Sequence, residues 1–274
     1  MWNRKPVYAG QFYAAEEDDL KREMSHYLQH AELPDINGTV LAVIAPHAAH
    51  YFSGPIAAYS YNLLSVSKPD VVIVLAPSHK SSFLGASYID SGTYDTPLGS
   101  VPIDEKITQT LMRRPNFFFI KEPHEKEHSL EVQVPFLQHI LGDFTIVPLI
   151  VGTTEDRTMR KIGETLAEII ASDERKVGLV ISTDLSHYHK HDEAIVIDGQ
   201  FIDTLLSMDE DELRHMVETR EAEACGIGPV VIGLIACKKL GANKVQFLRY
   251  ATSGDTGGDK QQVVGYLSAA ILKE

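Results

Sequence analysis

Short apolar runs alternate with longer amphipathic stretches along most of the chain. Four runs are rich in β-branched residues and bounded by Gly, Pro or charged residues, which predicts buried strands over 38–46, 69–77, 144–152 and 176–183. Two later strands are predicted over 243–252 and 261–272, and turn signals in 86–104 predict a hairpin. Apolar residues at helical spacing predict helices over 16–31, 54–64, 105–114, 127–142, 156–172, 193–208, 211–220 and 228–241.

Alternation of strands with helices predicts a mostly parallel central sheet that is covered by helices on both faces. The predicted fold class is therefore α/β. The helix over 127–142 contains Pro135, where we expect it to kink or restart. Because no linker, repeat or low-complexity segment divides the chain, we expect residues 1–274 to form a single domain.

Charge and composition exclude several classes of function. Lys and Arg total 25 and Asp and Glu total 38, so the net charge is 25 − 38 = −13. Without a basic run, such a chain is not expected to bind nucleic acid or a membrane. It contains neither a stretch of about 18 apolar residues nor a signal-peptide core, which predicts a cytoplasmic protein. Cys225 and Cys237 fit no zinc motif and are interpreted as buried thiols.

Four predicted strands are followed at once by side chains that can bind a metal or transfer a proton. His47 follows the first strand in "IAPHAAHYFSG", and His79 follows the second in "VVIVLAPSHK". Asp184 and His187 follow the fourth in "STDLSHYHKH", and Asp255 follows a late strand in "TSGDTGGD". Because ligands of open α/β sheets bind outside the carboxyl ends of the strands, we expect these side chains to share a site.

Each of these residues also has a structural interpretation. A single histidine after a strand more often forms a local hydrogen bond than a ligand contact, but two strands that end in Ala-Pro before a histidine favour function. Asp255 lies in a glycine-rich segment, where aspartate commonly forms a turn. His50 is equally compatible with exposure to solvent. Histidines on predicted helices are interpreted as structural: His26, His30, His139 and His215.

Two histidines and one carboxylate from separate elements match the ligand set of non-haem Fe(II) sites, which leaves positions open for substrate or oxygen. Zinc bound by two histidines, a carboxylate and water would give the same pattern. Tyr51 and Phe52 follow His47 closely and are predicted to contact a ligand. His128 and Glu131 share a helix face at i, i+3, which is typical of a solvated pair when nothing else accompanies it.

Seven ordered motifs resemble the Memo family, whose bacterial and archaeal members are often called AmmeMemoRadiSam system protein B. They are VYAGQFY, IAPHAAHYFSGPIAAYSY, LAPSHK, GTYDTPLG, EHSLEVQVPFL, STDLSHY and YATSGDTGGDKQQVVGYLSAAI. The resemblance runs nearly from end to end. It implies the fold of the class III extradiol ring-cleaving dioxygenases, which use non-haem iron.

The resemblance also implies roles for particular residues. His47 and His79 match the two metal-binding histidines of the family, whereas Asp184 and His187 match its active-site aspartate and acid/base histidine. A further motif, "EHSLE", lines the pocket of the family and contributes His128 and Glu131 here.

The third metal ligand is left open. For animal members, the resemblance implies a cysteine ligand in the segment that matches "SGDTGG", where this chain has Thr256 beside Asp255. A carboxylate favours iron, manganese or zinc, whereas a thiolate favours copper. We therefore expect Fe(II), with zinc, manganese or copper as alternatives. Asp255 is the expected third ligand, with Thr256 as a pocket residue, and either Thr256 or His187 could complete the site instead.

Two functions of different classes are compatible with these residues. The first is a metal-dependent redox enzyme of dioxygenase type, in which His187, oriented by Asp184, moves a proton at the substrate. The second is a binding module in which Tyr51, Phe52 and the histidines recognise a peptide or a small aromatic ligand without turnover. In both cases the expected partner is a small molecule or peptide in the metal pocket. The sequence predicts neither the substrate nor the oligomeric state.

Overall fold

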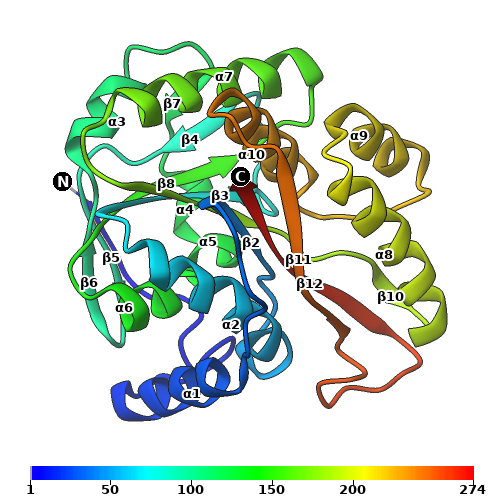
Figure 1. The fold of residues 1–274 in the computed structure, drawn as a ribbon. Coiled ribbons are helices and arrows are strands. Elements are labelled where there is room, and N and C mark those ends of the chain that lie inside the picture. Colours follow the sequence, from blue (N-terminus) through cyan, green and yellow to red (C-terminus); the bar gives the residue numbers. More distant parts are fainter. Residues whose placement is uncertain (1) are drawn as a thin grey trace.

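A nine-stranded sheet between two layers of helices dominates the computed structural model, which describes residues 2–274 (Figure 1). The strands run in the order β10-β12-β2-β9-β3-β8-β4-β7, and β11 also pairs with β12. Their bounds are β2 (Thr39–Ala45), β3 (Val71–Pro77), β4 (Ala86–Tyr88), β7 (Phe117–Phe119), β8 (Thr145–Val151), β9 (Val177–Ser182), β10 (His187–His189), β11 (Lys244–Thr252) and β12 (Val263–Lys273).

Helices cover both faces of this sheet (Figure 1). One layer contains α1 (Glu17–His30), α2 (His50–Ser67) and α6 (Val134–Leu141), and the other contains α7 (Asp156–Ser172), α8 (His191–Leu206), α9 (Glu210–Thr219) and α10 (Ile227–Lys239). Three shorter helices are α3 (Glu105–Leu111), α4 (Glu122–Glu125) and α5 (His128–Glu131). A separate small sheet has the order β1-β5-β6, formed by β1 (Trp2–Arg4), β5 (Gly92–Thr96) and β6 (Gly99–Pro102).

The central strands are buried on both faces, which explains why they read as continuous apolar runs. In β2, Ala42 and Ile44 pack into the core beneath α7 and α10, whereas Val43 and Ala45 pack into the core beneath α1 and α2. Successive side chains of a strand point to opposite faces of the sheet, so an all-apolar strand fills both cores at once.

The α/β fold class predicted from the sequence is confirmed, with one refinement of the sheet. The four central strands β2, β9, β3 and β8 are parallel to one another, and β4 is parallel to β7. The other neighbours pair antiparallel: β12 with β2, β11 and β10, and β4 with β8. The predicted helix over 127–142 is two helices, α5 and α6, which are separated at residues 132–133. Pro135 occupies the first turn of α6, where its missing N–H costs no hydrogen bond.

The order of the central strands in the sheet differs from their order along the chain. Strand β9 lies between β2 and β3, although it is separated from both by about a hundred residues or more of sequence. Because β2, β9 and β3 are parallel, their carboxyl ends lie side by side at one edge of the sheet. The segments that follow them, which begin near His47, Asp184 and His79, are therefore neighbours in space.

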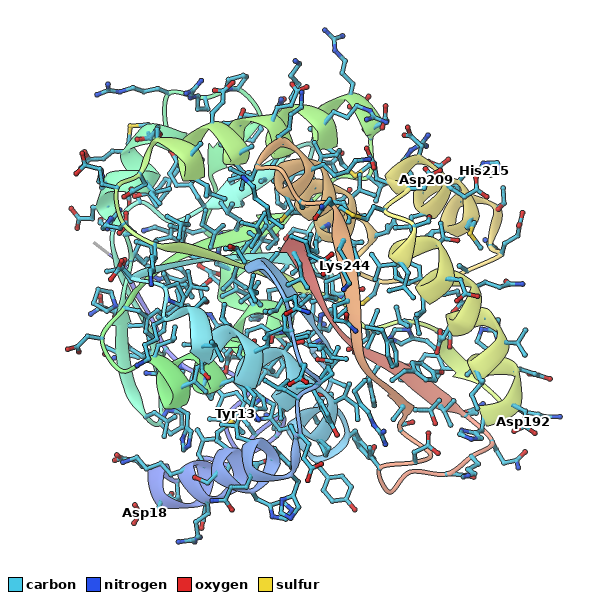
Figure 2. The ribbon with its side chains drawn as sticks, viewed as in Figure 1. Tyr13, Asp18, Asp192, Asp209, His215 and Lys244 are labelled. Atoms are coloured by element: carbon cyan, nitrogen blue, oxygen red, sulfur yellow. The ribbon has the colours of Figure 1, made fainter. Side chains whose placement is uncertain are left out.

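Two other predictions concern parts of the chain away from this edge of the sheet. Figure 2 shows His215 on the outer side of α9, away from the sheet, in agreement with its interpretation as a residue without a site role. Among residues 2–274, no helix combines the length and the apolar character that crossing a bilayer requires.

A buried histidine outside this edge gives the fold a predictable dependence on pH. Burial lowers the pKa of His124 to about 3, and its ring bonds the Tyr94 hydroxyl (2.6 Å) and the Ser87 hydroxyl (3.1 Å). Below about pH 6.5, the pKa of an unfolded histidine, His124 is protonated in the unfolded state but stays neutral in the folded state. This group therefore lowers the free energy of unfolding as the pH falls from about 6.5 towards 3.

We expect His124→Gln to remove that contribution while it keeps polar contacts with the same partners. Between pH 6 and pH 4, the free energy of unfolding of the variant should fall less steeply than that of the wild type, by about 1.4 kcal/mol per pH unit. Urea unfolding at a series of pH values measures both slopes. Parallel curves for the two proteins would contradict the assignment.

Candidate metal centre

Three histidines meet at the carboxyl edge of the central strands. His47 follows β2, His79 follows β3 and His128 begins α5, and one ring nitrogen of each lies within 4.8 Å of the other two. The ring centroids are 5.2 Å apart for His47 and His79, 5.5 Å for His47 and His128, and 4.9 Å for His79 and His128. This spacing allows a single ion to contact all three rings.

Hydrogen bonds around His47 fix which of its ring nitrogens faces the other histidines. The Ser182 hydroxyl donates its only proton to the Ser129 carbonyl (2.7 Å) and accepts from Gln133 Nε2 (2.9 Å). It must therefore accept from Nδ1 of His47, which lies 2.8 Å away. Nδ1 of His47 thus carries the proton, and its Nε2 presents a lone pair.

Glu127 has the same effect on the other two rings. Its Oε1 lies 2.9 Å from Nδ1 of His79 and 3.2 Å from Nδ1 of His128. Burial would raise the pKa of Glu127, but the hydrogen bonds from His128 and His79 outweigh it and hold the pKa well below its usual range. The carboxylate is therefore ionised, accepts from both Nδ1 atoms and leaves both Nε2 atoms free.

The environment of His47 favours the neutral form of its ring. Burial lowers its pKa well below the usual value, and a positive charge on the nearby His79 or His128 ring would lower it further. A neutral imidazole is the form that binds a metal ion. The structure therefore supplies three oriented imidazoles, at least one of which resists protonation.

Two more polar groups face His47. Asp184 accepts a hydrogen bond from the His47 backbone N–H at Oδ1 (2.7 Å), and its Oδ2 lies 4.0 Å from Nε2 of the same residue. The Cys225 Sγ atom lies 3.1 Å from that Nε2. Burial raises the pKa of Asp184, and burial together with the charge of Asp184 raises the pKa of Cys225. Both groups adjoin the ligand atom of His47.

His187 reaches the same region from β10. Its Nδ1 donates to the Leu185 carbonyl (2.7 Å), which leaves Nε2 without a bonded proton. The ring lies close enough that a proton gained at Nε2 would lower the pKa of both His47 and Asp184. A backbone carbonyl contact was the structural alternative for this residue, and the structure contains it, but it uses only one ring nitrogen. The role of His187 in proton transfer stays a prediction.

Comparison with known proteins identifies the family of this chain. A sequence profile described as "Memo-like protein" matches residues 4–270. The chain belongs to the Memo family. It is 37% identical to a MEMO1 family protein of Methanopyrus kandleri, with 98% of each chain covered, and 38% identical to one of Sulfurisphaera tokodaii, with 97% of this chain and 98% of that protein covered. The family assignment made from seven motifs is thus confirmed.

A solved structure supports the fold of this Memo-family chain. An uncharacterized protein of Escherichia coli superposes with a TM-score of 0.54 and covers 85% of this chain and 100% of its own length. Because the two sequences share 16% identity, the likeness concerns the fold alone.

Asp255, which the sequence predicted as a metal ligand, lies outside the group of three histidines. Asp255 is not at the histidines: its Oδ2 accepts from the Thr252 backbone N–H (2.9 Å), and its Oδ1 lies 3.6 Å from Nε2 of His191. With Thr256, it lines a separate cavity of about 220 Å³ formed mainly by α1, α2 and β11. Strand β12 separates β11 from β2, so the loop after β11 lies away from the central strands. His128 is instead the third member of the group of side chains that could hold an ion.

A cysteine does lie at the histidines, but in another segment from the one that the resemblance implies for animal members. Cys225 precedes α10, and the following residue, Gly226, packs so closely that a Cβ there would lie 2.3 Å from the Ser182 carbonyl. This contact brings the loop against the end of β9 and places the Cys225 thiol beside His47. Cys225 is a free thiol whose pKa is raised by burial, as the interpretation required, and the structure adds its position beside His47. The glycine between it and an apolar helix was the available signal.

Glu131, predicted as a pocket residue beside His128, is bonded to the N-terminal segment. Its buried carboxylate pairs with Arg4 and accepts from the backbone N–H groups of Val7 (3.0 Å) and Tyr8 (2.8 Å) and from the Tyr13 hydroxyl. Because all four partners belong to the N-terminal segment, the Glu131 carboxylate anchors that segment to α5. His128, at the other end of α5, belongs to the histidine group instead.

The anchored N-terminal segment supplies an aromatic wall that the sequence analysis did not predict. The rings of Tyr8 and Phe12 lie 5.7 and 4.9 Å from the His128 ring, and 4.9 Å from each other. Both residues belong to "VYAGQFY", a motif used above only for the resemblance. The closely spaced aromatic residues of this motif were the signal for a second role.

The remaining predicted residues lie on α2. Tyr51 is 62% exposed, and Phe52 packs against Ala251 and Tyr266. Their contact with a ligand stays a prediction. His50 is structural, because its Nε2 donates to the Val132 carbonyl (2.8 Å) and burial lowers its pKa to about 4.

Proposed function

We propose that this Memo-family chain binds one Fe(II) ion through Nε2 of His47, His79 and His128 and carries out redox chemistry of the dioxygenase type. The observation that supports it is the convergence of three imidazoles whose Nδ1 atoms are each occupied by another partner. Metal-binding histidines almost always donate their other N–H in this way.

The donor set narrows the choice of metal. Imidazole suits iron, zinc, copper and nickel, whereas manganese and magnesium prefer oxygen ligands. The thiol of Cys225 beside His47 is a soft donor that adds to this preference. The choice of iron rests on the resemblance to the extradiol dioxygenases, and zinc and copper are the alternatives.

The residues around the histidines have separate tasks in this proposal. A bound Fe(II) ion would supply Lewis acidity and redox chemistry. Asp184 holds the loop after β2 through the His47 backbone N–H. His187, with Nδ1 fixed on the Leu185 carbonyl, accepts or returns a proton of the substrate at Nε2. Tyr8 and Phe12 shape an apolar wall beside His128 and limit the access of water.

Glu127 offers a sharp test, because a single carboxylate orients two of the three rings. Glu127→Gln keeps the size of the side chain, but its amide can no longer accept from both Nδ1–H groups with full negative charge. We expect the affinity for Fe(II) or Zn(II) to fall by about 10- to 100-fold. Isothermal titration under anaerobic conditions measures the change. Glu125→Gln is the matched control, since that residue is exposed on the neighbouring helix α4.

A binding function without turnover is the second candidate. The aromatic wall of Tyr8 and Phe12 beside His128 favours it, since such rings also bind a peptide or a small aromatic ligand. In that case the three histidines would recognise the ligand directly.

Metal analysis separates the two functions. The protein should be produced without a histidine tag, purified under anaerobic conditions and analysed for all transition metals. About one ion per chain, lost in a variant that lacks all three histidines, is expected for the metal enzyme. A chain that stays free of metal after incubation with Fe(II), Zn(II) or Cu(I), yet binds aromatic ligands, would contradict the metal proposal.

A further inference from the structure

The segment that carries His187 has an unusual backbone. Tyr188 adopts a positive φ of 64°, a conformation that residues with a bulky side chain rarely take. It lies between His187 and His189 in β10, where the pairing with β12 shifts register. Its side chain is 72% exposed, so packing does not hold it in place. Strained residues of this kind persist only where the surrounding structure imposes them.

A single carboxylate bonds the residues on both sides of Tyr188. Oε2 of Glu223 accepts from the His187 backbone N–H (3.1 Å), and its Oε1 accepts from Nε2 of His189 (2.8 Å). Strand β10 pairs with β12 only through His187 and His189, so the sheet itself gives little support to Tyr188. Glu223 therefore supplies contacts that hold the ends of the bulge together.

The loop that bears Glu223 is also attached to the metal centre. Cys225, two residues later, donates its backbone N–H to the Asp184 carbonyl (3.2 Å) and places its Sγ beside His47. The carboxylate thus links the segment of His187 to the wall of the site that contains Cys225 and Asp184. A displacement of the bulge would move the His187 ring relative to the three metal-binding histidines.

We propose that Glu223 is a positioning residue that holds residues 187–189 in their strained bulge and so aims Nε2 of His187 at the metal site. The inference rests on the proposed function for the task of His187, but the positioning itself can be measured without any metal. The proposal explains why Tyr188 keeps a positive φ although β10 pairs with β12 only at the residues on either side of it.

The test compares Glu223→Ala, Glu223→Gln, Tyr188→Gly and the double variant Glu223→Ala/Tyr188→Gly. Glycine takes positive φ without strain, so it should keep the bulge when the carboxylate is gone. Glu221→Ala is the matched control, because this residue of the same loop is exposed and its carboxylate accepts from the nearby Thr219 hydroxyl rather than from residues 187–189.

The first measurement is hydrogen exchange at the His187 amide, followed by NMR in protein without added metal. We expect exchange in Glu223→Ala to be at least about tenfold faster than in the wild type, since the amide loses its acceptor and the bulge opens. Glu223→Gln, which keeps an acceptor, should change exchange less. In the double variant, exchange at His187 should be slower than in Glu223→Ala, because the glycine stabilises the bulge.

The second measurement is binding of 4-nitrocatechol to Fe(II)-loaded protein as a function of pH. Glu223→Ala should keep Fe(II) affinity near the wild-type value, bind the probe about 10- to 100-fold more weakly and lose part of the pH dependence of binding. Tyr188→Gly should restore much of this affinity in the Glu223→Ala background and change little in the wild type. Such non-additivity identifies coupling between the two residues.

Two outcomes would overturn the inference: exchange and probe binding of Glu223→Ala equal to the Glu221→Ala control, or effects of Glu223→Ala and Tyr188→Gly that simply add. Loss of Fe(II) binding in Glu223→Ala would also overturn it, by showing a general structural role. If the wild type binds neither Fe(II) nor 4-nitrocatechol, the proposed function fails, and the exchange data alone decide the positioning role.

Discussion

Replacement of His79 by alanine is expected to lower the affinity for Fe(II) or Zn(II) by more than about 100-fold, a larger loss than outer partners of metal ligands usually cause. The variant removes one of the three imidazoles and leaves only two ring nitrogens near the centre. Its fold should persist, because the His79 side chain is 28% exposed and lies after the end of β3 rather than in the core. Anaerobic isothermal titration, with circular dichroism as a check of the fold, measures both expectations.

Asp255→Asn is the matched control for this variant. Asp255 was predicted from the sequence as a ligand, but the structure places it in the cavity beside α1 and α2. Its replacement should leave metal affinity unchanged. Wild-type affinity in His79→Ala, or a comparable loss in Asp255→Asn, would show that the ion binds elsewhere.

The sequence predicted two members of the histidine group because their signal is local. His47 and His79 each follow an apolar run that ends in Ala-Pro, and the periodicity of the chain was enough to place both runs in a buried sheet. Asp184 was found for the same reason. Their proximity depends on β9, which inserts between β2 and β3, and only tertiary structure reveals that order.

Contacts between segments without regular periodicity could not be predicted in this way. Glu127 bonds rings that come from two different elements, and Cys225 reaches His47 only because Gly226 allows close approach to the end of β9. Neither feature leaves a periodic signal. Asp255 misled the sequence analysis because a turn-forming aspartate and a metal-binding aspartate look alike until the partners of the carboxylate are known.

The ion pair of Arg4 with Glu131, which anchors the N-terminal segment, also leaves no periodic signal in the sequence. We expect its loss to lower the free energy of unfolding strongly. Arg4 and Glu131 form an ion pair in which each side chain is only 1% exposed. Arg4 also donates to the carbonyls of His124 (2.9 Å) and Glu127 (3.0 Å). Removal of one charge from such a pair leaves the other buried without compensation, which is far more costly than the loss of an exposed pair.

We therefore expect Glu131→Ala to lower the free energy of unfolding by about 3–5 kcal/mol. Lys244→Ala, which breaks an exposed pair with Glu274, should cost less than about 1 kcal/mol and serves as the control. Replacement of both partners, in Arg4→Met/Glu131→Leu, should recover part of the loss, because no unpaired charge then remains in the interior. Urea unfolding of the four proteins measures these differences. If Glu131→Ala lowers the free energy of unfolding no more than Lys244→Ala does, the ion pair does not hold the N-terminal segment in place. The position of Tyr8 and Phe12 beside His128 would then need another explanation.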